Sequence, residues 1–243
     1  MQPVLKPLKI LQPLLKTKLL KLKKKAVVFD LDGTILDTIG DIASAVNYAL
    51  DAYGFKPRTK EEVISFIGNG SLMLIRRALG DESAEKYDDN FVKEVRARFR
   101  EEYQKHMFDE TYIYDGVSEL VDELKEMGIV SVVVTNKDDR SAVPMIKHYF
   151  GDRFAYVRGV RADTERKPNP ELTLSVLNEL GIKPSEALFI GDGMADLKVS
   201  QNCGIDYIPI GYGYTSPERL FAECQKTPVS DVKSLREAII EYL

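Results

Sequence analysis

The sequence has few residues of the kinds that build disulfide frameworks, zinc sites or membrane spans. Its 243 residues include two cysteines, Cys203 and Cys224, whose positions fit neither a disulfide framework nor a metal-ligand spacing. We therefore expect a reducing environment and predict a cytoplasmic location. Long apolar runs are missing from a chain in which 30% of the residues are charged, so we predict no transmembrane helix.

Histidine is equally scarce. The chain has two, His106 and His148, and each stands alone in a stretch of helical pattern, so we interpret both as structural. Hydrophobic residues make up 44% of the sequence, which is enough for a substantial core in one large domain or two modest ones.

Acidic residues are missing from the first 25 positions, which carry eight lysines. The whole chain has a net charge of −4, so the remaining residues carry −12, which argues against nucleic-acid binding by the body of the protein. Leucines recur here at three- and four-residue spacing, as in an amphipathic helix, although three prolines disfavour a helix in the first half. We assign residues 1–24 to a basic amphipathic extension. A dispensable extension or a misassigned start is favoured over binding to an anionic membrane surface, for which this is the one candidate segment.

The stretch of residues 25–38 carries the strongest local signal. Residues 26–29 are apolar and β-prone, which predicts a buried strand. Asp30 and Asp32 follow where that strand should end, and a glycine then permits a turn. Ligands of open α/β sheets bind in the crevice at the carboxyl ends of the strands. We therefore expect these two carboxylates to take part in chemistry rather than to form a surface turn.

The pattern then stays helical from residue 39 to residue 112. Apolar residues recur at helical spacing in four stretches, the last expected over residues 84–106. Thr59 and Glu62 form the pattern of a capping box at the start of the second stretch. No part of the region alternates like a strand, so we predict an all-helical insert of residues 39–112.

Strands and helices alternate in the rest of the chain. Strands are expected at residues 129–134, 187–190 and 207–210, with a weaker signal at 155–157, and helical patterns lie between them. Repeated β–α units predict a parallel sheet flanked by helices, which is an α/β fold. The predicted core therefore comprises residues 25–38 and 113–243, with the helical insert between its two parts.

Polar side chains gather at the predicted strand ends. Parallel strands bring their carboxyl ends to one edge of the sheet, so we expect the following residues to converge there with the loop residue Lys167: Asp30, Asp32, Thr135, Asn136, Asp192 and Asp196. Carboxylates held together raise one another's pKa, and a hard cation such as Mg²⁺ relieves this repulsion. A threonine hydroxyl and a lysine charge suit phosphate. The combination predicts phosphoryl transfer to an aspartate with Mg²⁺.

Four motifs resemble, in order, those of the haloacid dehalogenase superfamily. They are Phe-Asp-Leu-Asp-Gly-Thr from residue 29, Val-Thr-Asn-Lys from 134, Lys-Pro-Asn-Pro from 167, and Gly-Asp-Gly-Met-Ala-Asp from 191. Residues 66–79, and Gly-Tyr-Gly-Tyr from residue 211, are similar to the phosphoglycolate phosphatase branch. The resemblance implies a Rossmann-like core, a helical cap formed by the insert, and bound Mg²⁺. One position departs from it, because Gly193 stands where these phosphatases often have serine.

The resemblance also implies a role for each matching residue. Asp30 would be the nucleophile, and Asp32 would protonate the leaving group and later activate water. The metal would be held by the carboxylates of Asp30 and Asp192 and the backbone carbonyl of Asp32, with Asp196 in support.

Charge on the phosphoryl group would be stabilised by Thr135, Asn136 and Lys167. Asp196 and Asn136 have an alternative interpretation as helix caps. In the implied cap, Asn69 lies at a helix start that favours an anion, and Arg77 falls at the cap arginine of phosphoglycolate phosphatase sequences. We expect both to contact the substrate, although Arg77 could instead be a solvated helix residue.

The predicted function is therefore Mg²⁺-dependent hydrolysis of a small phosphorylated metabolite, with phosphoglycolate as the expected substrate. A sugar-phosphate mutase of the β-phosphoglucomutase type and an inorganic pyrophosphatase remain alternatives within the superfamily. Asp32 and Asp192 argue against a 2-haloacid dehalogenase. A catalytically weak module held at a membrane by residues 1–24 is the alternative of another class. The oligomeric state is left open.

Overall fold

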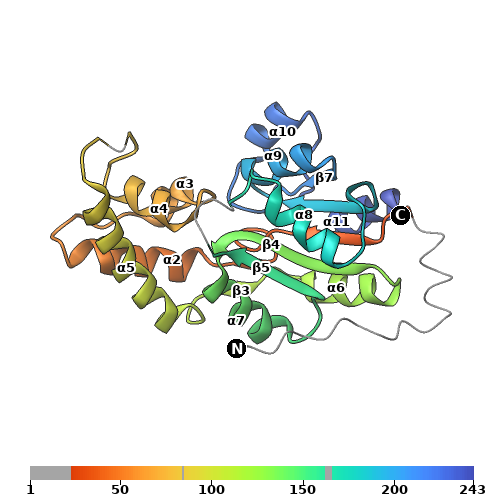
Figure 1. The fold of residues 1–243 in the computed structure, drawn as a ribbon, viewed down its shortest axis with the longest axis horizontal. Helices are drawn as coiled ribbons and strands as arrows, with labels where there is room; N and C mark the ends of the chain where they lie inside the picture. Colours follow the sequence, from red (N-terminus) through yellow and green to blue (C-terminus); the bar gives the residue numbers. More distant parts are fainter. Residues whose placement is uncertain (1–22, 84, 162–165) are drawn as a thin grey trace.

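The computed structural model of the protein describes residues 23–83, 85–161 and 166–243 (Figure 1). Most of the predicted amphipathic extension therefore lies outside the described residues, and only its last two positions fall within them. In the described part of the chain, no helix combines the length and apolar character needed to cross a membrane.

A five-stranded sheet forms the core, in the order β5-β4-β1-β6-β7, and every pair of neighbours is parallel. Its first strand, β1, lies in the centre and is completely buried because the predicted apolar run has a neighbour on each edge. Phe29 is paired with Val133 of β4 on one side and with Ile190 of β6 on the other, so three strands end side by side. The strands are β1 (Ala26–Phe29), β4 (Val130–Asp138), β5 (Tyr156–Val160), β6 (Ala187–Gly191) and β7 (Asp206–Pro209).

Helices cover both faces of this sheet (Figure 1). Val28 and Val132 belong to a buried cluster that includes α8 and α9, whereas Val27, Phe29 and Val133 belong to a second cluster that includes α6, α7 and α11. Successive side chains of a strand point to opposite faces, which explains the two clusters. The α/β fold class predicted from the sequence is confirmed. The covering helices are α6 (Val117–Glu126), α7 (Asp139–Phe150), α8 (Glu171–Glu179), α9 (Met194–Cys203) and α11 (Val232–Tyr242).

Four further helices form a block beside the carboxyl edge of the sheet, toward the left in Figure 1. They are α2 (Ile39–Asp51), α3 (Lys60–Phe66), α4 (Gly70–Ala78) and α5 (Asp89–His106). The capping box predicted at the start of α3 is present, since Thr59 and Glu62 each bond to the other's backbone N–H. The longest helix, α5, begins at Asp89 rather than at residue 84, because the Asp88 side chain accepts the N–H groups of Asn90 and Phe91.

Two short strands and two short helices were not predicted, and one of these helices is the 3₁₀ helix η2 (Pro184–Glu186) before β6. The two-residue strands β2 (Leu36–Asp37) and β3 (Tyr112–Ile113) pair in antiparallel fashion where the chain enters and leaves the helical block. The predicted domain limits at residues 38/39 and 112/113 stay predictions, and this small sheet lies beside both. Helix α10 (Pro217–Cys224) follows β7, with Ser216 as its N-cap.

A buried lysine, Lys24, lies just before β1. The side chain of Lys24 is 1% exposed, its Nζ lies 2.6 Å from Asp206 Oδ2, and it donates a hydrogen bond of 2.9 Å to the carbonyl of Ser185. These contacts attach the segment before β1 to the short 3₁₀ helix η2 (Pro184–Glu186) before β6 and to β7.

Replacing this lysine should destabilise the fold. Lys24→Met removes the ion pair of a buried lysine with Asp206 and its hydrogen bond to the carbonyl of Ser185, so we expect a loss of about 1–2 kcal/mol and a melting temperature lower by a few degrees. Lys23→Met is the matched control, because the neighbouring side chain is exposed. Equal melting temperatures for the two variants would show that the buried contacts contribute nothing measurable.

Candidate active site

The first candidate carboxylate follows β1 directly and lies beside the end of β6. The Asp30 N–H donates to the carbonyl of Ile190 at 3.0 Å, which continues the pairing of the two strands beyond Phe29. Gly33 then turns the chain with φ of +76°, and a β-carbon there would lie 2.6 Å from Asp192 Oδ2. Only glycine fits this turn without displacing Asp192. The close approach of the two strand ends therefore depends on a residue without a side chain.

Three of the predicted metal ligands meet at this point. Each of Asp30, Asp192 and Asp196 offers a carboxylate oxygen, and these oxygens lie within 4.8 Å of one another. Asp192 is 4% and Asp196 1% exposed. Burial, and then the negative charge of Asp30, raise the pKa of Asp192 to about 7. The same two causes raise the pKa of Asp196, while Lys167 opposes the shift.

Lys167 supplies the positive charge beside this cluster. Its Nζ lies 2.7 Å from Asp196 Oδ1 and 2.9 Å from Asp30 Oδ1, and it donates to the carbonyl of Val134 at 2.9 Å. Burial lowers the pKa of Lys167, but the nearby Asp196 and Asp30 more than offset this effect and leave it raised. We therefore expect a charged ammonium in direct contact with two carboxylates.

The carboxylates of Asp192 and Asp196 are held by backbone N–H groups. Asp196 Oδ2 accepts the N–H of Gly193 at 2.9 Å. Gly193, which stands where related phosphatases often have serine, therefore still donates a hydrogen bond to Asp196 through its backbone. Asp192 Oδ2 accepts the N–H of Tyr214 at 2.7 Å, and its Oδ1 accepts the Thr34 hydroxyl at 3.2 Å. Both acids are thus fixed in orientation by the loops that follow the strands.

This donor set fits a hard divalent cation. Asp30 Oδ1 is buried and, although Lys167 lies near, no described donor meets this oxygen in hydrogen-bond geometry. Closely spaced carboxylate oxygens, one of them without a hydrogen bond, are the ligands that Mg²⁺ prefers. A cation at this position would also offset the repulsion that raises the pKa of Asp192.

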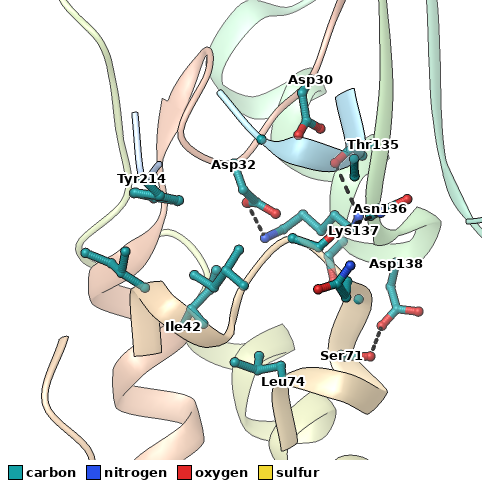
Figure 2. Close-up of a pocket in the computed structure, with 18 of the residues that line it drawn as sticks. Asp30, Asp32, Ile42, Ser71, Leu74, Thr135, Asn136, Lys137, Asp138 and Tyr214 are labelled. Atoms are coloured by element: carbon teal, nitrogen blue, oxygen red, sulfur yellow. Dashed lines mark hydrogen bonds and ion pairs between the residues drawn. The ribbon is translucent and has the colours of Figure 1, made fainter. Parts of the chain in front are cut away.

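The predicted phosphate-binding residues on β4 lie beside Asp30 (Figure 2). Thr135 is 1% exposed, and its Oγ1 accepts only the N–H of Lys137 among the residues that the structure describes, which leaves the hydroxyl proton available. Both the nitrogen and the oxygen of the Asn136 side chain make hydrogen bonds. Its amide donates to the carbonyls of Gly68 and Lys167 at 2.9 and 3.1 Å, and its Oδ1 accepts the N–H of Lys167 at 2.7 Å. Asn136 therefore holds the loop that carries Lys167.

Asp32 is not part of the carboxylate cluster of Asp30, Asp192 and Asp196, and it faces the helical block (Figure 2). Its Oδ1 accepts two hydrogen bonds, one from the Thr38 hydroxyl at 2.7 Å. The other comes from Lys137 Nζ at 2.8 Å (Figure 2). Lys137 belongs to the Val-Thr-Asn-Lys motif, yet the sequence analysis gave it no role. Its position on an apolar strand next to Thr135 and Asn136 was the signal available.

Tyr214 is the second residue that the sequence analysis missed. Besides its N–H bond to Asp192, its hydroxyl accepts the N–H of Thr38 at 2.7 Å and donates to Asp37 Oδ1 at 3.0 Å. The Gly-Tyr-Gly-Tyr motif contains this residue, but the motif alone does not reveal that Tyr214 links Asp192 to β2, the strand that leads into the helical block.

These side chains open into a cavity of about 780 Å³ between the sheet edge and the helical block. Asp30, Asp32, Thr135 and Asp192 line the sheet side. The predicted cap residues Asn69 and Arg77 line the opposite side, where Arg77 donates to the carbonyl of Phe66 at 2.9 Å and to Asn69 Oδ1 at 2.8 Å. In this arrangement Arg77 holds the loop before α4. The neighbouring Arg76 points into the block and pairs with Asp81 at 2.7 Å.

Comparison with known proteins identifies the family. The family model for haloacid dehalogenase-like hydrolases matches residues 27–210. The chain belongs to this family. It is 32% identical over 212 residues to a phosphoglycolate phosphatase of Chromobacterium violaceum, covering 87% of this chain and 96% of the relative. A phosphoglycolate phosphatase of Pseudomonas putida is 30% identical over 213 residues, covering 87% and 78%.

Solved structures agree with this assignment. A crystal structure of a Lactobacillus delbrueckii subsp. bulgaricus protein matches with a TM-score of 0.84 at 29% identity, covering 90% of this chain and 99% of that protein. The predicted membership of the haloacid dehalogenase superfamily, in its phosphoglycolate phosphatase-like branch, is confirmed. The chain is accordingly a hydrolase in which residues of the first, second and fourth motifs line one cavity and Lys167 of the third motif contacts Asp30 and Asp196.

In this haloacid dehalogenase-like hydrolase, Asp192 should make the stability of the metal-free protein fall as the pH rises. The pKa of Asp192 in the folded state, about 7, exceeds its usual value of 3.8. The folded state therefore binds more protons than the unfolded state between these values, and raising the pH through this window destabilises it.

The comparison of wild type with Asp192→Asn in EDTA checks this expectation. Between about pH 5 and pH 8 the wild type should lose roughly 2 kcal/mol more than the variant, which is a difference of several degrees in melting temperature. Parallel pH profiles for the two proteins would contradict the raised pKa of Asp192.

Proposed function

We propose that the chain is a Mg²⁺-dependent phosphatase that hydrolyses small phosphomonoesters through an aspartyl phosphate, with phosphoglycolate as its substrate. The observation that carries this proposal is that Asp30, Asp32 and Thr135 line one cavity at the carboxyl edge of the sheet, with the ammonium of the buried Lys167 2.9 Å from Asp30 Oδ1. The names of the relatives, phosphoglycolate phosphatases, support the choice of substrate. The free thiols of Cys203 and Cys224 support the proposed cytoplasmic location.

The metal would be held by the carboxylates of Asp30 and Asp192 and by the backbone carbonyl of Asp32. Asp196, which bonds to Lys167 and to the Gly193 N–H, would orient this set. When bound, Mg²⁺ would supply positive charge that lets an anionic nucleophile and an anionic phosphate approach each other.

Chemistry would then proceed in two steps. In the first, a carboxylate oxygen of Asp30 forms a bond to phosphorus while the bond from phosphorus to the ester oxygen breaks, and Asp32 gives its proton to that oxygen. In the second, water attacks phosphorus and gives a proton to Asp32 as the bond to Asp30 breaks, which restores the carboxylate and releases phosphate. Lys167 and the Thr135 hydroxyl would balance charge on the phosphoryl oxygens in both steps.

Asp30→Asn tests the nucleophile. The amide keeps the shape of the side chain but cannot attack phosphorus, so turnover of a generic phosphate ester should fall by at least about 10³-fold. EDTA should abolish wild-type activity to a similar degree, and added Mg²⁺ should restore it. Asp51→Asn, at an exposed position on α2, is the matched control.

Two results would contradict this mechanism. One is substantial turnover by an Asp30→Asn protein that melts as the wild type does, and the other is full activity in EDTA. A parallel screen with pyrophosphate and hexose phosphates tests the alternative substrates, since efficient use of either in place of phosphomonoester hydrolysis would replace the proposed function.

The preference for phosphoglycolate is tested at Asn69 and Arg77, which line the cavity opposite Asp30. If these residues contact the substrate carboxylate, Arg77→Ala and Asn69→Ala should each lower kcat/KM for phosphoglycolate roughly tenfold or more. The value for p-nitrophenyl phosphate, which has no carboxylate, should change much less. Arg98→Ala is the control, because Arg98 is an exposed arginine of α5 that does not line the cavity.

Arg77 also bonds to Asn69 and to the carbonyl of Phe66, so the two substrates distinguish two roles. Equal losses on both substrates would mean that Arg77 only holds the loop before α4. The absence of any preference for phosphoglycolate in the wild type would leave a broad phosphatase as the description of the chain.

A further inference from the structure

The carboxylate of Asp32 is held by one oxygen. Its Oδ1 accepts the Thr38 hydroxyl at 2.7 Å and Lys137 Nζ at 2.8 Å, whereas no described residue donates a hydrogen bond to Oδ2. Two donors on one oxygen fix the rotation of the carboxylate and leave the other oxygen free. Because Asp32 lines the cavity, Oδ2 is the oxygen available to exchange a proton there.

Lys137 is enclosed on the side away from Asp32. Its side chain is 6% exposed, and its ammonium lies over the ring of Tyr103, 4.5 Å from the centroid. Tyr103 is 4% exposed and comes from α5, in the helical block rather than the sheet. A desolvated ammonium over an aromatic face is attracted to the ring, so Tyr103 favours this one position of Nζ.

Lys137 has few other interactions among the described residues. Among the described residues, the hydrogen bond of its Nζ goes to Asp32, and Lys167 rather than Lys137 is the lysine beside Asp30. Lys137 therefore lies between a core carboxylate and a ring of the helical block, where it can set the orientation of the carboxylate.

We propose that Lys137, held over the ring of Tyr103, is a positioning residue that fixes Asp32 with Oδ2 free for proton exchange with the reacting ester. This inference rests on the proposed function and adds two residues to it. Proton transfer then requires that the helical block lies against the sheet edge, because α5 of this block supplies the Tyr103 ring that holds Lys137 in place.

Lys137 and Tyr103 affect the transfer of one proton, the proton on Asp32. In the first step the proton on Asp32 Oδ2 goes to the ester oxygen as its bond to phosphorus breaks, so the alcohol leaves neutral. An alkyl alcohol is a poor leaving group and needs this proton, whereas 2,4-dinitrophenolate leaves without it. Misplacing Oδ2 should therefore slow alkyl phosphates selectively.

The test compares kcat/KM for phosphoglycolate and 2,4-dinitrophenyl phosphate in the full chain with Mg²⁺. This parameter covers only the steps up to release of the alcohol, so hydrolysis of the phosphorylated enzyme does not enter it. Lys137→Met should lower the value for phosphoglycolate about 10²-fold and the value for the dinitrophenyl ester less than about threefold. The ratio of the two values is independent of how much of each preparation is folded.

Tyr103 provides the second pair of variants. Tyr103→Leu removes the ring and should lower the same ratio by roughly tenfold, whereas Tyr103→Phe keeps the ring and should stay within about twofold of the wild type. Equal losses on both esters in Lys137→Met, or no loss at all, would overturn the proposal. A selective loss there with an unchanged ratio in Tyr103→Leu would overturn the role of Tyr103. Failure of the wild type to hydrolyse either ester would instead refute the proposed function.

Discussion

The repulsion among three closely spaced carboxylates, two of them buried, is the constraint on which the rest of this structure depends. Asp30, Asp192 and Asp196 are brought together by the parallel pairing of β1 with β6, and their proximity is unfavourable unless positive charge lies beside them. Lys167 provides one such charge, and the surrounding structure is arranged to keep it there. Asn136 makes two hydrogen bonds to the backbone of Lys167, and the carbonyl of Val134 accepts one from the Lys167 ammonium. Asn202 of α9 donates to the carbonyl of the following residue, Pro168, at 2.8 Å. These contacts hold the ammonium of Lys167 beside the carboxylates and so offset part of their repulsion.

The end of β4 connects this cluster to the helical block through three consecutive residues. Asn136 donates to the carbonyl of Gly68, Lys137 lies over Tyr103, and Asp138 pairs with Arg100 of α5 and accepts the Ser71 hydroxyl of α4. Successive side chains of an extended strand point in different directions, so one strand end reaches α4, α5 and the preceding loop at once. The same three residues follow Thr135, which lines the cavity. The block is therefore coupled to the chemistry by contacts as well as by its position over the cavity.

Much of this arrangement could be predicted from the sequence, for a physical reason. An apolar run that ends in polar residues defines both a buried strand and its carboxyl end, so the amino-acid pattern alone assigns Asp30, Thr135 and Asp192 to one edge of the sheet. The rest depended on information that short segments do not carry. Strands β2 and β3 have two residues each, too few for a periodic pattern, and α10 buries only Leu220. The link from Lys137 to Asp32 requires the path of β4 beyond its apolar part, and the bonds of Arg77 to Phe66 and Asn69 require the fold of a loop.

The order of the strands has a consequence for the growing polypeptide. The first strand of the core lies at the centre of the sheet, and both of its neighbours are encoded later than the whole helical block. Asp37 and the hydroxyl of Tyr214 that bonds to it are 177 positions apart, so β2 is complete long before its tyrosine leaves the ribosome. During synthesis the four helices emerge while β1 still lacks both partners. The acidic cluster is then assembled among the last features of the molecule. Until that point, a nascent chain can form the helical block on one side of the cavity without the sheet edge on the other side.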